Sequence, residues 1–267
     1  MSESTASSPG AEGAVHLHID GPVASMLFDR PAARNAMTWT MYSDLAAACD
    51  TLSANPEVRV AVLRGVGGKA FVAGTDIAQF QEFDSGADGV AYEQRLAAYV
   101  ARVDALAVPT IAVVEGMAVG GGMAIATVCD FRIATPGARF GVPIARTLGN
   151  CLSAGTLKVM VEALGVGLVK RMLLLAELVP AEELLACGFV LKTVAAETLD
   201  AEVDELCQRL AGHAPITMSV TKQLLSRIVA GGDEPDLPLL EHCYASDDFH
   251  EGVDSFVNRR PPRWTGR

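Results

Sequence analysis

The sequence is short of positive charge, of closely spaced cysteines and of long apolar runs. Its 267 residues carry a formal net charge of -11, so we expect no broad electrostatic contact with nucleic acid or with an anionic membrane surface. The six cysteines are widely spread, with no C-x-x-C pair, and no signal-peptide pattern begins the chain. This pattern favours reduced thiols and a cytoplasmic location. No apolar run approaches the roughly 20 residues that a membrane span needs, so we expect no membrane segment.

The chain divides by composition and periodicity into three parts. Residues 1–13 contain no large apolar residue after the initiator Met, and we expect them to form a disordered tail. Half of all residues are hydrophobic, which is enough to bury a sizeable core. Residues 14–195 alternate strand and helix patterns, which predicts βαβ crossovers and an α/β core. Residues 196–267 show mainly helical periodicity, which predicts a C-terminal helical region.

Local signals place the individual elements. Asp20-Gly21 suits the turn of a hairpin spanning Val15–Phe28, and Thr38 is suited to cap a helix that Asn55-Pro56 ends. Pro180 and Pro215 each stand where a helix can begin. The remaining predicted strands are Val58–Leu63, Thr110–Val114, Phe131–Ala134 and Phe189–Val194, and the remaining predicted helices include 92–106 and 121–129.

Two patterns that resemble catalytic or metal sites are incomplete. His16 and His18 would lie on one face of a strand, as metal ligands can, but no third ligand is apparent nearby and we expect no metal. Ser153 lies in CLSAG, one glycine short of the G-x-S-x-G pattern that exposes a nucleophilic serine. We therefore expect no serine hydrolase of that type.

Two glycine-containing segments each follow a predicted strand. They are AFVAGTDI (Ala70–Ile77) and EGMAVGGGMA (Glu115–Ala124), and the carboxyl ends of strands are where open α/β sheets bind ligands. The second segment leads directly into a helix, whose first N–H groups and dipole favour a developing negative charge. Two such N–H groups can hold one oxygen as a carbonyl becomes an enolate or a tetrahedral anion. The alternative is that these glycines only allow a helix to pack tightly against a strand.

In this order and spacing, the segments resemble the crotonase superfamily, also called the enoyl-CoA hydratase/isomerase family. The resemblance also includes RPAARNAM (Arg30–Met37), APITMSVTKQLL and EGVDSFVNRRPPRW, so it covers nearly the whole chain. It implies an acyl-CoA enzyme built as a spiral of repeated ββα units with a C-terminal helical region used in assembly. It further implies a homotrimer that often pairs into a hexamer, with coenzyme A entering as part of the substrate and no separate cofactor.

The resemblance also implies roles for particular residues. The two oxyanion-holding amides fall on Thr75 and Gly121, and two tail positions that close over coenzyme A from a neighbouring subunit fall on Phe256 and Arg259. Arg34 and Arg259 are suited to neutralise phosphates, although each could equally be a solvated surface arginine. The stretch that grips coenzyme A falls on Ala33, Arg34, Ala70, Ala73, Asp76 and Ile77.

The two glutamates that familiar hydratases use to move protons are missing. Their positions fall on Ala124 and Ile144, and the stretch 141–161 contains no Asp or Glu. Since hydration needs acid and base groups, standard enoyl-CoA hydration is not expected, and three interpretations remain open. The first is decarboxylation or other thioester processing, helped by Arg146 or Asn150. The second is a base supplied from elsewhere, such as Glu82, Asp84 or Glu93. The third is a CoA-thioester-binding or scaffold protein without catalysis.

Overall fold

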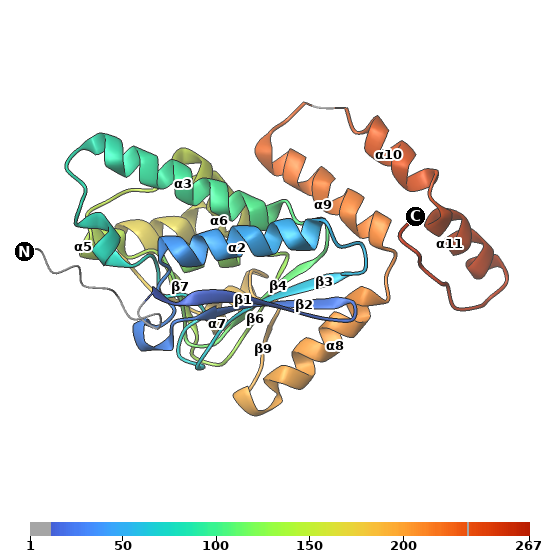
Figure 1. Ribbon diagram of the computed structural model, residues 1–267, viewed down its shortest axis with the longest axis horizontal. Coiled ribbons are helices and arrows are strands. Elements are labelled where there is room, and N and C mark those ends of the chain that lie inside the picture. Colours follow the sequence, from blue (N-terminus) through green and yellow to red (C-terminus); the bar gives the residue numbers. More distant parts are fainter. Residues whose placement is uncertain (1–11, 234) are drawn as a thin grey trace, which may run out of the picture.

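The computed structural model describes residues 12–233 and 235–267, so residues 1–11 of the predicted tail lie outside the described residues. A central six-stranded sheet has helices on both faces, with α2 and α3 on one face and α8 on the other (Figure 1). The sheet consists of β1 (Ala14–Asp20), β2 (Val23–Asp29), β3 (Val60–Gly65), β4 (Thr110–Val114), β6 (Phe131–Ala134) and β9 (Lys192–Thr193). This arrangement confirms the predicted α/β class.

The strands follow the order β1-β2-β3-β4-β6-β9. The β1 and β2 strands form the predicted antiparallel hairpin around Asp20-Gly21, and the other pairs are parallel. The parallel strands need crossover connections, which the helices between them provide. The predicted strand Phe189–Val194 is wrong in length, because only Lys192–Thr193 pairs with β6. The preceding residues close the end of a helix instead, with the Val190 N–H donating to the Leu184 carbonyl.

A second, three-stranded sheet lies beside the first and has no counterpart in the sequence prediction. It contains β5 (Met117–Val119), β7 (Arg139–Gly141) and β8 (Val179–Pro180), in the order β5-β7-β8. An isolated parallel bridge between Val72 and Ala118 joins it to the first glycine segment, and a second bridge pairs Met37 with Thr75 of that segment. Strands of two or three residues are too short to show a period-2 pattern, yet they bring the two glycine segments together.

The helices on the first face begin at sequence signals of known type. The Thr38 hydroxyl accepts the Met41 N–H at the start of α2 (Trp39–Ser53), as predicted. The next helix, α3 (Gly86–Asp104), begins earlier than predicted because Ser85 and Asp88 form a capping box. The same face continues with α4 (Gly121–Val128), α5 (Ile144–Thr147), α6 (Ala154–Leu174) and α7 (Ala181–Ala186).

The last part of the chain is helical, as predicted, and extends away from α3 and α5 (Figure 1). It holds α8 (Leu199–Ala211), α9 (Pro215–Ala230), α10 (Leu237–Tyr244) and α11 (Asp247–Val257). Lys222 of α9 joins this part to the core, since its Nζ donates to Asp130 at 2.6 Å and to the Val108 carbonyl at 3.0 Å. None of the described helices is both long and apolar enough for a membrane crossing.

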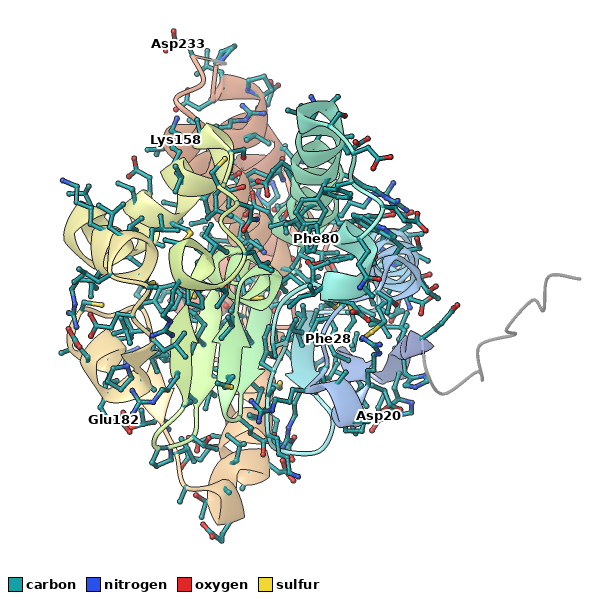
Figure 2. The ribbon with its side chains drawn as sticks, turned by 90° about the vertical axis from the view of Figure 1, so that its left-hand side faces the viewer. Asp20, Phe28, Phe80, Lys158, Glu182 and Asp233 are labelled. Atoms are coloured by element: carbon teal, nitrogen blue, oxygen red, sulfur yellow. The ribbon has the colours of Figure 1, made fainter. Side chains whose placement is uncertain are left out.

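Alternation along β3 divides the core between the two faces of the sheet. Val60 and Val62 pack with α8, while Ala61 and Leu63 pack with the larger cluster under α2, α4 and α6. Figure 2 shows Phe28, which is fully buried, at the level of the sheet, and Phe80 in the helical layer beyond it. The larger cluster supports the segments that carry the candidate site.

Asn35 fastens the turn before α2 to the segment that leads into the first glycine motif. It is fully buried at a φ of 58°, and its amide donates to the carbonyls of Val66 at 3.0 Å and Ala70 at 2.8 Å. Its Oδ1 accepts the Arg30 N–H at 2.9 Å. Three backbone groups therefore depend on one side chain.

We predict that Asn35→Ala lowers the free energy of unfolding by about 2–4 kcal/mol, because it leaves buried backbone groups without partners and removes the polar side chain that lets a non-glycine residue adopt the left-handed conformation. Urea denaturation measures the change. Asn258→Ala is the matched control, since Asn258 is exposed and bonds only within its own helix end. Equal effects of the two substitutions would contradict the role given to Asn35.

Candidate active site

A cavity of about 340 Å³ opens between α3, α4, α5 and the start of α6. Its wall contains both glycine segments, through Gly74, Thr75, Gly120 and Gly121. A second cavity of about 670 Å³ adjoins it and shares with it Phe80, Tyr92, Glu93, Ala97, Leu148, Asn150 and Leu152. Most of the lining is apolar, so a ligand held here is largely removed from water.

The two glycine segments touch through their backbones. Gly74 has a φ of 104° and Gly120 a φ of 55°, conformations that side-chain-bearing residues rarely adopt. A β-carbon on Gly120 would stand 3.5 Å from the Gly74 Cα. The alternative that glycines serve close packing is correct for Gly122, where a β-carbon would lie 2.1 Å from the Val72 carbonyl oxygen. The close packing and the cavity wall are therefore made by the same run of glycines.

In the part of the chain that the structure describes, the N–H groups of Thr75 and Gly121 are left without acceptors. Met37 donates to the Gly74 carbonyl at 2.8 Å and accepts from the Asp76 N–H at 2.9 Å, so this bridge uses the residues on either side of Thr75. Gly121 is the first residue of α4, where an N–H has no intrahelical partner. Among the described residues neither group donates a hydrogen bond. Two backbone donors are therefore available to an oxygen in the cavity.

Two tyrosines hold the Thr75 side chain. Its hydroxyl is 2.9 Å from the Tyr42 hydroxyl and 2.8 Å from the Tyr92 hydroxyl. Burial raises the pKa of Tyr42 above its ordinary value and that of Tyr92 to about 12, so both are neutral at physiological pH. This network holds Thr75, whose N–H has no acceptor among the described residues, and it does so with neutral groups only.

The segments predicted to grip coenzyme A meet at one edge of the cavity. The Ala73 N–H donates to the Arg34 carbonyl at 3.1 Å, and the side chain of Ile77 is 59% exposed at the cavity wall. Asp76 forms an ion pair with Arg30 at 2.7 Å. Ala70 is 1% exposed, so its side chain packs in the core. Ala33 and the exposed Arg34 lie in the turn before α2.

Other predicted residues are divided between the cavity and the surface. Ala124, Ile144 and Asn150 line the cavity, whereas Arg146 is exposed on α5 and does not. Phe256 is 86% exposed at the end of α11, and Arg259 follows it. Figure 1 shows α11 on the opposite side of the chain from α5. In one copy of the chain these two tail residues are therefore remote from the cavity.

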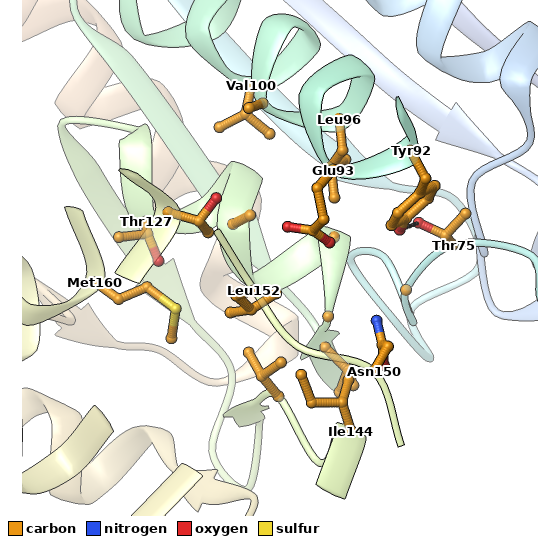
Figure 3. Close-up of a pocket in the computed structure, with 18 of the residues that line it drawn as sticks. Thr75, Tyr92, Glu93, Leu96, Val100, Thr127, Ile144, Asn150, Leu152 and Met160 are labelled. Carbon is orange, nitrogen blue, oxygen red and sulfur yellow. Dashed lines mark hydrogen bonds between the residues drawn. The ribbon is translucent and has the colours of Figure 1, made fainter. Parts of the chain in front are cut away.

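Of the three acidic residues named as alternative bases, Glu93 alone lines the cavity. Glu82 and Asp84 are exposed outside its wall. Figure 3 shows the Glu93 carboxylate projecting from α3 into the cavity, with Thr75 to one side and Leu152 across from it. Its Oε2 accepts the Ser153 N–H at 3.0 Å, and burial raises the pKa of its carboxyl group. A carboxyl group with a raised pKa in a cavity wall is typical of acid–base sites.

The sequence offered one signal for Tyr92 and Glu93 that the prediction did not use. The Ser85-x-x-Asp88 capping box places the start of α3 at Gly86. Glu93, Leu96, Ala97, Val100, Ala101 and Asp104 then follow at the spacing of one helix face, and all line the cavity. The spacing therefore identifies one face of α3, but it does not show which other segments complete the cavity opposite that face.

Comparison with known proteins gives consistent matches over almost the full chain. The family model described as enoyl-CoA hydratase/isomerase matches residues 18–267. The chain is 29% identical to the short-chain-enoyl-CoA hydratase of Clostridium acetobutylicum, over 92% of this chain and 95% of that protein. It is 30% identical to the 2,3-dehydroadipyl-CoA hydratase of Escherichia coli, over 92% of this chain and 96% of that protein. The structure of an enoyl-CoA hydratase/carnithine racemase from Magnetospirillum magneticum superposes with a TM-score of 0.88, at 30% identity, covering 95% of this chain and 96% of that one.

The packing of Gly121 against Tyr42 can be tested by substitution. A β-carbon on Gly121 would lie 2.4 Å from the Tyr42 hydroxyl, so we predict that Gly121→Ala lowers the free energy of unfolding by about 1–3 kcal/mol through overpacking. Tyr42→Phe removes the hydroxyl that the added β-carbon would overlap. The double variant should therefore recover part of the lost free energy of unfolding. Urea denaturation of the two single variants and the double variant gives the coupling. Additive effects of the two substitutions would show that the contact is absent.

Proposed function

The chain belongs to the enoyl-CoA hydratase/isomerase family, and from that premise we propose that it processes an acyl-CoA thioester by holding the thioester oxygen with the N–H groups of Thr75 and Gly121. These donors would stabilise the enolate or oxyanion that forms when the α-carbon loses a proton or the carbonyl is attacked. One such donor typically contributes about 3 kcal/mol to transition-state stabilisation. The observation that carries the proposal is the pair of N–H groups without acceptors in the wall of one apolar cavity.

Coenzyme A binding is proposed for the edge of the cavity where Ala33 and Arg34 meet Ala73, Asp76 and Ile77. The turn before α2 presents the Arg34 guanidinium at the surface, where a phosphate can be neutralised. Because Asp76 already pairs with Arg30, its carboxylate would orient that turn rather than repel the phosphates.

Assembly of the chain into trimers, or hexamers made of two trimers, is also proposed. Phe256, Val257 and Val253 at the end of α11 are 86%, 71% and 50% exposed, and apolar side chains grouped in this way favour contact with another protein surface. In such an assembly Phe256 and Arg259 would close over coenzyme A bound by a neighbouring copy.

The reaction differs from hydration by a pair of glutamates. Ala124 and Ile144 line the cavity at the two positions where the family resemblance expects those glutamates, and a methyl and a sec-butyl group transfer no protons. Decarboxylation, isomerisation and hydrolysis each use a stabilised thioester anion. The same two residues favour the alternative function, a CoA-thioester-binding protein without catalysis.

The proposal is tested by incubating the protein with a panel of acyl-, enoyl- and malonyl-CoA thioesters and following their masses. Gly121→Pro removes one donor, and proline suits the first position of a helix; the Tyr42→Phe background removes the hydroxyl that the ring would meet. We predict that turnover falls about 10²- to 10³-fold relative to Tyr42→Phe alone. Unchanged turnover would contradict the role given to the N–H groups of Thr75 and Gly121. Tight binding without turnover of any thioester would favour the non-catalytic alternative.

A second test addresses the missing glutamates. We predict that the protein hydrates crotonyl-CoA slowly, and that Ala124→Glu combined with Ile144→Glu raises the rate by about 10-fold or more, because it supplies an acid–base pair. Loss of the enoyl-thioester absorbance measures both rates. Rapid hydration by the unaltered protein is the result that would contradict this expectation.

A further inference from the structure

Three hydroxyl groups meet beside the N–H groups of Thr75 and Gly121. The Thr75 Oγ1 lies 2.9 Å from the Tyr42 hydroxyl and 2.8 Å from the Tyr92 hydroxyl. A β-carbon on Gly121 would stand 3.4 Å from the Thr75 Oγ1 and 2.4 Å from the Tyr42 hydroxyl. The hydroxyl network therefore adjoins both of the residues to which the proposed function gives the oxygen-holding N–H groups.

This network holds one more proton than its hydrogen bonds use. A hydroxyl group donates one hydrogen bond and accepts up to two, so three hydroxyls bring three protons, whereas two hydrogen bonds join them. None of the three hydroxyls has another partner in the part of the chain that the structure describes. One of the three protons is therefore without an acceptor there.

Burial assigns the unused proton to Thr75. Tyr42 is fully buried and Tyr92 is 8% exposed, and a buried hydroxyl that fails to donate costs free energy of folding. The Thr75 Oγ1 is the acceptor within reach of both tyrosines. A phenol is also a stronger acid than an aliphatic alcohol, so it is the better donor of the pair. Both tyrosines therefore donate to Thr75, which fills the two lone pairs of its oxygen and leaves its own proton free.

Thr75 is also the member of the network that is best placed for a ligand. It is half-buried and lines the cavity, whereas Tyr42 does not line it. Figure 3 shows Thr75 beside Tyr92 at one side of the cavity. The hydroxyl and the N–H of one residue are separated by two carbon atoms, so an oxygen that accepts from the Thr75 N–H lies close to the Thr75 hydroxyl as well.

We propose that the Thr75 hydroxyl is a third hydrogen-bond donor to the thioester oxygen, so that Thr75 is a catalytic residue through its side chain as well as its backbone. This inference rests on the proposed function, because its acceptor is the oxygen that the two N–H groups hold. Negative charge that develops on this oxygen then meets three hydrogen bonds instead of two. The two phenols that donate to the Thr75 oxygen polarise its O–H bond, which strengthens the third hydrogen bond.

The two tyrosines are positioning residues in this arrangement. By donating to the Thr75 oxygen they hold its hydroxyl in one orientation. Burial raises the pKa of Tyr92 to about 12 and that of Tyr42 above its ordinary value, so both phenols remain protonated at neutral pH. The network therefore supplies a hydrogen bond without a proton-transfer step, and no covalent bond within it is broken.

A purely structural network, in which the hydroxyls only satisfy one another, makes a different prediction about Thr75. Thr75→Val keeps the backbone N–H and the branched shape but has no hydroxyl, whereas Thr75→Ser keeps the hydroxyl. Both are made in a Tyr42→Phe/Tyr92→Phe background, so that no tyrosine hydroxyl is left unpaired or turns toward the ligand in place of Thr75. Thr51→Val is the matched control, since Thr51 is exposed and its hydroxyl donates to the Ala47 carbonyl at 2.9 Å within α2.

The experiment measures the infrared stretching frequency of the thioester carbonyl in bound acetyl-, butyryl- and octanoyl-CoA, each isotopically labelled at that carbon, with binding checked by calorimetry. Relative to the background, we expect Thr75→Val to raise the carbonyl frequency, because one fewer hydrogen bond weakens the C=O bond. We also expect it to lower the turnover of any reactive thioester about 10- to 100-fold. Thr75→Ser should match the background, and Thr51→Val should match the unaltered protein.

The carbonyl frequency decides the question whether or not the protein turns a thioester over. Equal frequencies for the Thr75→Val and Thr75→Ser variants, both with thioester bound, would overturn the third donor even where the two N–H groups do hold the oxygen. Restoring the two tyrosines to the background should lower the frequency further, because they orient and polarise the Thr75 hydroxyl. If the unaltered protein binds no CoA thioester, the proposed function itself fails, and the inference that rests on it fails with it.

Discussion

The site depends on a close approach of two stretches of backbone, 72–75 and 117–122. Side chains ordinarily keep backbones apart, but here Gly74, Gly120 and Gly122 allow the two stretches to lie nearly in contact. The short strands of the second sheet hold that approach, with the Val119 N–H donating to the Val72 carbonyl at 3.0 Å. A consequence of the resulting geometry is that the N–H groups of Thr75 and Gly121 donate to no acceptor within residues 12–233 and 235–267.

Unsatisfied backbone groups and an unpaired carboxylate are costly for folding, and this chain places both in one cavity wall. The surrounding structure compensates with well-packed aromatic and backbone contacts. The Trp39 ring packs at a tilt against Tyr42 and edge-on against Tyr92, and the Arg95 guanidinium lies 3.9 Å from the Trp39 ring centroid. Stability supplied by this rigid shell allows polar groups in the cavity to remain available to a ligand.

The sequence predicted the buried elements well and the short or marginal ones poorly. Thr110–Val114 and Phe131–Ala134 are strands with the predicted bounds, because continuous β-branched and apolar runs between turn signals permit few alternatives. The three-stranded sheet was missed, since β5, β7 and β8 are held by pairing with distant residues rather than by local preference. Residues 189–191 were predicted as strand because they are apolar, whereas Phe189 and Val190 are buried and the Val190 N–H donates to the Leu184 carbonyl of α7.

The sequence by itself determined the class of fold, the order of its longer elements, the two glycine segments and the family. Each of these is local, being encoded by the spacing of apolar residues or by glycines within a few positions of one another. Only the tertiary structure decided which acidic residue enters the cavity. Glu82, Asp84 and Glu93 are all carboxylic acids in one stretch of chain, and the sequence prediction did not distinguish between them. The direction in which Glu93 points is set by the packing of α3 on α4 and by the Ser153 N–H, sixty residues away in the chain.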